Sequence, residues 1–200
     1  MLSFCVNGCR ISIHFLFIAA VTFLILCDTQ GTVLAGVTAA ALHESAHLTA
    51  MFLLKVPPKQ VRLHPFGIDI VRSDGVDHSY GKDAIISVCG PAMNLAIAGI
   101  FFFIHNPVFT RFMLANVVLG VFNFLPVETL DGGQALYAGL CIRLKTERAA
   151  LCVRILSFLT LIPLAAMGFL ILFQSRYNFT LLLVTIYLTI LLVVKKGYSL

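Results

Sequence analysis

The chain has 200 residues, of which 60% are hydrophobic and only 12% are charged, about half the charged fraction of a typical soluble domain. A mean hydropathy of +0.98 excludes a water-soluble globular protein of ordinary composition. The formal net charge of +5 would suit a nucleic-acid binder, but in so apolar a chain Lys and Arg are expected in the loops between membrane spans. We therefore exclude nucleic acid as a partner.

Six apolar blocks approach or reach the length needed to cross a hydrocarbon core about 30 Å thick, at about 1.5 Å per residue of helix. The first two blocks are separated only by residues 28–31, so they are expected to form an antiparallel helical hairpin. The pattern predicts a single all-α polytopic membrane domain covering residues 1–200. Its predicted spans are residues 11–27, 32–54, 84–104, 112–126, 149–173 and 179–194.

The connection of residues 55–83 is the longest between predicted spans. Residues 60–72 alternate apolar and polar side chains around Pro65 and Gly67, which predicts a small membrane-associated β-hairpin after the second span. An edge strand of this hairpin could hold an unwound substrate by strand addition.

Lys and Arg are distributed unevenly over the connections, and an excess of these residues marks the cytoplasmic side of a membrane. Only Arg111 and Arg176 lie at one set of span ends, and Arg154 lies near the start of the fifth span. The other set of ends carries eleven of the 14 basic residues: Arg10, Lys55, Lys59, Arg62, Arg72, Lys82, Arg143, Lys145, Arg148, Lys195 and Lys196. This predicts an integral, multi-pass membrane protein with both termini cytoplasmic.

Residues 43–47, in the second predicted span, form an H-E-x-x-H motif. The spacing puts His43 and His47 on one face of a helix, where both imidazoles can reach one ion, and Glu44 lies beside them to accept a proton from water. Ionisable side chains in the middle of an apolar helix are costly unless they are paired, so they are functional candidates. The motif predicts one zinc ion per chain, the alternative being hydrogen bonds to neighbouring helices.

A catalytic zinc site with two histidines needs a third protein ligand. The predicted orientation places His43 and His47 in the cytoplasmic half of the membrane, where the fourth span also ends and where Glu128 and Asp131 follow. Asp131 is the better candidate, because Pro126 ends or kinks the helix and the two glycines after Asp131 let the backbone turn closely. Glu128 is the alternative ligand, and Asp131 could instead cap a helix beginning near residue 134.

These motifs together resemble the site-2 protease family of zinc intramembrane proteases. The H-E-x-x-H motif is followed, about 80 residues later, by N-x-x-P-x-x-x-x-D-G at residues 123–132, and residues 90–94 match a G-P-x-x-N element of that family. The resemblance covers the second to the fourth predicted spans. It implies that His43, His47 and Asp131 bind zinc and that Glu44 is the catalytic base.

The resemblance also implies an activity and its partners. The layout, without a PDZ or CBS domain, resembles the compact branch that includes the sporulation sigma-factor processing proteases. We therefore expect an intramembrane zinc endopeptidase that cuts membrane-associated or single-span substrates within or near the cytoplasmic half of the bilayer, such as a membrane-tethered transcription or sigma factor. A membrane protein substrate, the lipid bilayer and a regulatory membrane protein are the expected partners.

Three further side chains are candidates for roles at the site, and two other functions are alternatives. Asn94 and Asn123 are candidate donors to the oxyanion or the substrate backbone, the alternative being hydrogen bonds between helices. His14 is expected to be a packing or gating residue. The alternative functions are a catalytically inactive metal-binding membrane protein, against which Glu44 argues, and a transporter, for which we find no inverted repeat.

Overall fold

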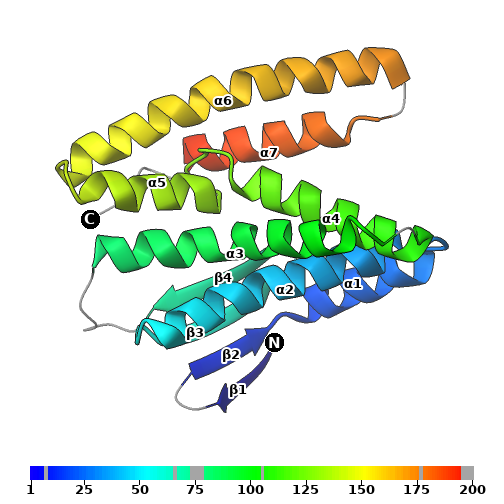
Figure 1. Cartoon of the computed structure of the whole chain (residues 1–200), viewed down its shortest axis with the longest axis horizontal. Coiled ribbons are helices and arrows are strands. Elements are labelled where there is room, and N and C mark those ends of the chain that lie inside the picture. Colours follow the sequence, from blue (N-terminus) through cyan, green and yellow to red (C-terminus); the bar gives the residue numbers. More distant parts are fainter. Residues whose placement is uncertain (7–8, 65–66, 73–78, 105, 176–177, 195–200) are drawn as a thin grey trace. The chain divides into compact units, whose positions relative to one another are not determined.

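The computed structural model describes residues 1–6, 9–64, 67–72, 79–104, 106–175 and 178–194. These residues form seven helices and four strands (Figure 1). They divide into two compact units, Met1–His78 with Cys89–Phe122, and Ser79–Val88 with Asn123–Leu200. The mostly helical fold is confirmed. The prediction of a single domain remains a prediction.

The first unit contains a four-stranded sheet in the order β1-β2-β3-β4. Strands β3 (Pro58–His64) and β4 (Gly67–Arg72) are antiparallel, which confirms the predicted hairpin. Strand β2 (Cys9–Ile13) pairs in parallel with β3 and antiparallel with β1 (Leu2–Val6). Since β3 has a neighbour on each side, β4 is the edge strand of the hairpin.

The N-terminal strands correct the prediction that a membrane span begins at residue 11. Residues 9–13 alternate polar and apolar side chains, as strands do, and the helix α1 (Phe15–Cys27) begins only after them. The pairing runs from Arg10 opposite Gln60 to Ile13 opposite Leu63, and the His14 N–H donates to the Leu63 carbonyl at 2.9 Å. The sheet thus joins the residue before α1 to the segment that follows the next helix.

Helices α1 and α2 (Thr32–Leu53) form the predicted hairpin, and they lie side by side (Figure 1). Because β2 precedes α1 and β3 follows α2, the β2–β3 pairing brings the start of α1 to the end of α2. At that end Lys55 adopts a left-handed conformation with φ 57, and the Val56 N–H donates to the Met51 carbonyl at 2.9 Å. This closing turn of α2, with Val56 and Met51 both buried, leads the chain directly into β3.

The turn between α1 and α2 is held by Asp28, which follows the last residue of α1. Its carboxylate accepts N–H bonds from Gln30 at 3.1 Å, Val33 at 2.7 Å and Leu34 at 3.4 Å, and Gly31 supplies the left-handed residue of the turn with φ 76. Removal of the carboxylate from water opposes its ionisation, but these backbone donors outweigh it and lower the pKa of Asp28.

Asp28→Ala is expected to lower the thermal unfolding midpoint by about 2–4 °C, because helix α2 loses its cap. Asp28→Asn keeps an acceptor oxygen and is expected to lose less. The lowered pKa means that the carboxylate stabilises the fold above its unfolded pKa of about 3.9 and that this contribution is lost as the pH falls through the folded value. Circular dichroism of the protein in detergent measures the midpoints, and equal values for wild type and Asp28→Ala would contradict the capping role.

Helix α3 (Tyr80–Phe101) belongs to both units, and α4 (Pro107–Asn123) ends the first unit. Both begin four or five residues before the predicted spans 84–104 and 112–126 and end three residues before them. Pro107 explains the start of α4, since proline is favoured at the first position of a helix.

The second unit contains α5 (Asp131–Cys141), α6 (Thr146–Ser175) and α7 (Thr180–Val194). Helices α6 and α7 lie side by side and match the predicted spans 149–173 and 179–194 (Figure 1). A Cβ added at Gly168 would lie 3.1 Å from the Leu182 Cα, so a glycine lets the two helices approach. Helix α5 was not among the predicted spans.

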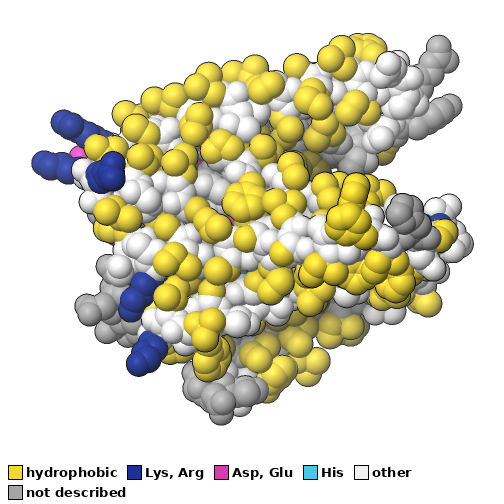
Figure 2. Space-filling view, viewed as in Figure 1, with side chains coloured by type: hydrophobic (Ala, Val, Ile, Leu, Met, Phe, Trp, Pro, Cys, Tyr) yellow, Lys and Arg dark blue, Asp and Glu magenta, His cyan; other side chains and the backbone are white. Residues whose placement is uncertain are grey.

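By length and composition, α3 and α6 suffice to cross a membrane, and α1, α4 and α7 are shorter apolar helices. Figure 2 shows hydrophobic side chains over the visible faces of the helices, with Lys and Arg near the start of α6. A surface this apolar suits lipid contact. The exposed apolar side chains of α6 include Leu151, Leu159, Ile162, Leu170 and Phe173. Six spans and their orientation remain predictions.

Candidate metal centre

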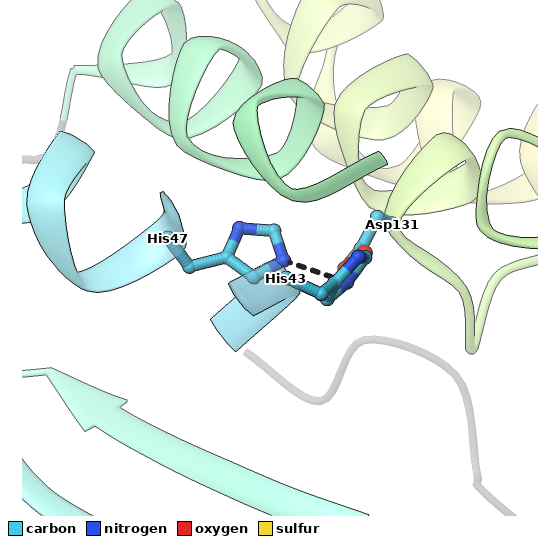
Figure 3. A group of neighbouring side chains, drawn as sticks. All are labelled: His43, His47 and Asp131. Atoms are coloured by element: carbon cyan, nitrogen blue, oxygen red, sulfur yellow. Dashed lines mark hydrogen bonds between the residues drawn. The ribbon is translucent and has the colours of Figure 1, made fainter. Parts of the chain in front are cut away.

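Two buried histidines one helical turn apart form the centre of the site. His43 and His47 lie on α2 and are 5% and 7% exposed, and their Nε2 atoms are 3.1 Å apart (Figure 3). Two nitrogen ligands at about 2.0–2.1 Å from a tetrahedral zinc ion lie about 3.3 Å apart. The pair therefore fits a shared zinc ion.

The ring of His43 is held by Asn94 of α3. Asn94 Nδ2 donates to the Ala39 carbonyl at 3.2 Å and to Asn116 Oδ1 at 2.8 Å, so its Oδ1 is the atom 2.6 Å from His43 Nδ1. An amide oxygen can only accept, so His43 Nδ1 carries the proton and Nε2 presents its lone pair. This is the tautomer that a metal ligand needs.

The geometry at Asn94 favours one of the two roles considered for it. Both N–H groups of its amide donate to other acceptors, and its oxygen accepts from His43. Hydrogen bonding between α2, α3 and α4 thus accounts for the whole amide group, which argues against a role as oxyanion donor.

Gly90, one turn before Asn94 on α3, makes room for the imidazoles. A Cβ added there would overlap His47 Nε2 and would lie 2.6 Å from His47 Cε1 and 2.8 Å from His43 Cε1. The G-P-x-x-N element thus has two physical functions: its glycine admits the rings and its asparagine orients one of them.

Gly90→Ala is expected to weaken zinc binding about 10- to 100-fold, because the added methyl group displaces both rings. Gly99→Ala on the same helix is the matched control, since a Cβ there meets nothing within 4 Å, and it is expected to bind zinc as wild type does. Competition with a chelator measures both affinities. Equal affinity for the two variants would contradict the packing role of Gly90.

Asp131 joins the histidines in a candidate ligand group. Among the residues that the structure describes, it is the third member of a group whose ligand atoms all lie within 4.8 Å of one another (Figure 3). Two imidazoles and one carboxylate are a ligand set of catalytic zinc sites. Glu128 is not a member of this group.

The helix that the capping alternative placed from about residue 134 begins three residues earlier. Helix α5 begins at Asp131 itself, after Leu130 as its N-cap residue, and the Gln134 N–H donates to the Leu130 carbonyl at 3.0 Å. The carboxylate is therefore carried by the first residue of a helix.

The two glycines after Asp131 serve close packing. A Cβ added at Gly132 would lie 2.6 Å from the Leu125 carbonyl oxygen, and one added at Gly133 would lie 2.7 Å from the Glu128 nitrogen. Among the described glycines only Gly31 has a positive φ. The glycines therefore let the chain before α5 lie against the first turn of that helix. They were expected to allow a sharp turn of the backbone, but neither has the positive φ of such a turn.

Glu128 lies in that chain and is 2% exposed. Its N–H donates to Ser157 Oγ at 2.8 Å, while its Oε1 has no hydrogen-bond partner among the described residues. The segment before α5 is thus fixed to α6 through its backbone.

The other candidate residues that the structure describes lie on α2 and α4 and at the start of α1. Glu44 is half-buried on α2 next to His43, and Asn123 is the last residue of α4 and half-buried. Their roles remain predictions. His14 is exposed as the N-cap residue of α1 and is not in the ligand group. His78 and His105 lie outside the described residues.

No family model and no curated protein matches the sequence. Among solved structures, the chain is similar to the site-2 protease from Methanocaldococcus jannaschii, with a TM-score of 0.58 and 19% sequence identity over 94% of this chain and 92% of that chain. The chain has a site-2 protease fold. The sequence motifs lie in the second to fourth predicted spans, whereas the structural similarity covers nearly the whole chain.

Asn116 is the residue of this site that the sequence analysis missed. It is fully buried on α4 and accepts from Asn94. An amide in an apolar helix is the same signal that singled out Asn94, but Asn116 belongs to none of the motifs.

Proposed function

We propose that this chain is an intramembrane zinc endopeptidase that cleaves membrane-associated or single-span proteins within or near the cytoplasmic half of the bilayer. The observation that carries the proposal is the pair of buried Nε2 atoms, 3.1 Å apart, that His43 and His47 present on α2 beside Glu44. The site-2 protease fold supports it.

His43, His47 and Asp131 would hold one zinc ion. This set provides three protein ligands, as catalytic zinc sites do, whereas structural sites are closed by a fourth. A bound zinc ion supplies positive charge that polarises a peptide carbonyl and makes water a stronger acid. Zinc as the metal, and Asp131 as its third ligand, are parts of the proposal.

Glu44 is the general base of the proposed reaction. Its carboxylate accepts a proton from the attacking water and later gives it to the nitrogen of the leaving amine. A protease requires a general base. The alternative, a metal-binding membrane protein without activity, does not require the Glu44 carboxylate.

The proposed substrates follow from the surroundings of the site. A helix must be unwound before one of its peptide bonds can be attacked, and β4, one of the two edge strands of the sheet, offers backbone groups to an extended segment. A membrane-tethered transcription or sigma factor is the class to test first. A regulatory membrane protein as partner and both termini on the cytoplasmic side are further parts of the proposal.

The test is cleavage of a panel of single-span proteins, including membrane-tethered sigma-factor precursors, by the purified protein in lipid vesicles. Mass spectrometry of the products locates the cut. Cleavage is expected to stop when a chelator removes the metal and to return when zinc is added. Zinc binding without cleavage of any panel member would favour the inactive metal-binding protein, and no zinc binding would overturn the proposal.

A further inference from the structure

The buried side chains of His43, Asn94 and Asn116 form a chain of hydrogen bonds that leads away from the ligand atoms. It runs from His43 Nδ1 to Asn94 Oδ1 at 2.6 Å, and from Asn94 Nδ2 to Asn116 Oδ1 at 2.8 Å. It ends where Asn116 Nδ2 donates to the Phe112 carbonyl at 2.8 Å. Both asparagines have no exposed surface, so water does not compete for these bonds.

The direction of every bond in this chain is set by two backbone carbonyls. A carbonyl oxygen can only accept, so the Phe112 carbonyl faces the amide nitrogen of Asn116 and turns the Asn116 oxygen towards Asn94. The Ala39 carbonyl faces the amide nitrogen of Asn94 in the same way. The Asn94 oxygen is thereby left for the proton on His43 Nδ1.

If the Asn94 amide were rotated so that its oxygen and nitrogen changed places, its oxygen would face two other acceptors, the Ala39 carbonyl and the Asn116 oxygen. Its amide nitrogen would then face His43 Nδ1. Buried acceptors that face one another are left without a donor, which is costly. Asn116, on α4, a helix that carries none of the ligands, thus opposes this rotation together with the Ala39 carbonyl.

We propose that Asn116 is a positioning residue that, through Asn94, holds His43 as the tautomer able to bind a metal at Nε2. This inference rests on the proposed zinc site. It assigns to α4 a part in preparing that site before any ion arrives. Hydrogen bonds to the second nitrogen of a ligating histidine are worth about 10- to 100-fold in metal affinity.

The test measures zinc affinity by chelator competition in a set of matched variants. Asn116→Leu and Asn94→Leu are each expected to weaken zinc binding about 10- to 100-fold. The double variant is expected to bind no more weakly than Asn94→Leu alone, because Asn116 acts through Asn94. Additive losses, or wild-type affinity in Asn116→Leu, would overturn the proposal.

Two further variants separate positioning from general damage to the fold. Asn94→Asp keeps an acceptor at His43 Nδ1 but puts a second oxygen against the Ala39 carbonyl and Asn116 Oδ1, so it is expected to recover only part of the affinity that Asn94→Leu loses. Thr185→Val removes a buried side-chain bond to the carbonyl one turn earlier, Leu181 at 2.7 Å, which is the same kind of bond that Asn116 makes to Phe112. It is expected to lower the unfolding midpoint without changing zinc affinity.

A second measurement reads the tautomer directly and needs no metal. Nitrogen NMR of histidine-labelled, zinc-free protein distinguishes a protonated Nδ1 from a protonated Nε2, and the signal absent from His43→Gln assigns His43. Wild type is expected to show His43 protonated at Nδ1, and Asn116→Leu a mixture of both tautomers. An unchanged tautomer in Asn116→Leu would overturn the inference, whereas a wild type that binds no zinc would instead overturn the proposed function.

Discussion

Glu44→Gln is expected to reduce peptide cleavage by about 10²- to 10⁴-fold while zinc binding stays at the wild-type level. The amide keeps the size and the position of the carboxylate on α2, but it cannot accept the proton of the attacking water. Since His43 and His47 are unchanged, the ligand atoms that lie 3.1 Å apart remain in place.

The measurement pairs the cleavage rate of a single-span substrate with the zinc content of the same sample. Glu147→Gln is the matched control, because it makes the same chemical change at an exposed position in the first turn of α6 and is expected to leave both values unchanged. Full cleavage activity in Glu44→Gln would contradict the assignment of the base. A joint loss of zinc and activity would indicate that Glu44 acts as a ligand.

Asp131→Ala is expected to weaken zinc binding about 100-fold or more and to abolish cleavage. A catalytic zinc site held by His43 and His47 alone lacks the third ligand that such sites need, and the carboxylate of Asp131 belongs to the one candidate group among the described residues. Chelator competition measures the affinity, and adding excess zinc is expected to recover only part of the activity.

Glu128→Gln supplies the control, since it changes a carboxyl group to an amide three residues earlier in the same segment. Its Oε1 has no hydrogen-bond partner among the described residues, so an amide of the same shape is expected to be tolerated. Zinc affinity is expected to equal that of wild type. The opposite pattern, with loss in Glu128→Gln and none in Asp131→Ala, would assign the ligand to Glu128.

The spacing of the motif was enough to predict the histidine pair. A separation of four residues on a helix fixes which side chains share a face, so the approach of His43 to His47 depends on α2 alone. The partners of His43 depend on contacts between helices, which spacing does not give. The sequence therefore left two roles open for Asn94, contact with the substrate or a hydrogen bond between helices, and Asn116 was missed.

The sequence was enough to predict elements that depend on a single helix or hairpin. The prediction was wrong where an element depends on contacts between segments far apart in the chain. Residues 11–13 suit the start of a span as well as a strand, and their pairing with residues 61–63 decides in favour of the strand. A helix in the region of α5 was weighed only from about residue 134, but it begins at Asp131, although two consecutive glycines cost about 1 kcal/mol each in a helix. Close contact between Gly133 and the backbone at Val127 and Glu128 outweighs that cost.

The parallel pairing of β2 with β3 has a consequence for how the protein is made. Arg10 lies opposite Gln60, so the first strands leave the ribosome before their partner, and both α1 and α2 must be made before the sheet can close. Pairings between segments so distant in the chain form slowly. Until β3 is made, the backbone groups of β2 that pair with it are open to pairing with a strand of another chain.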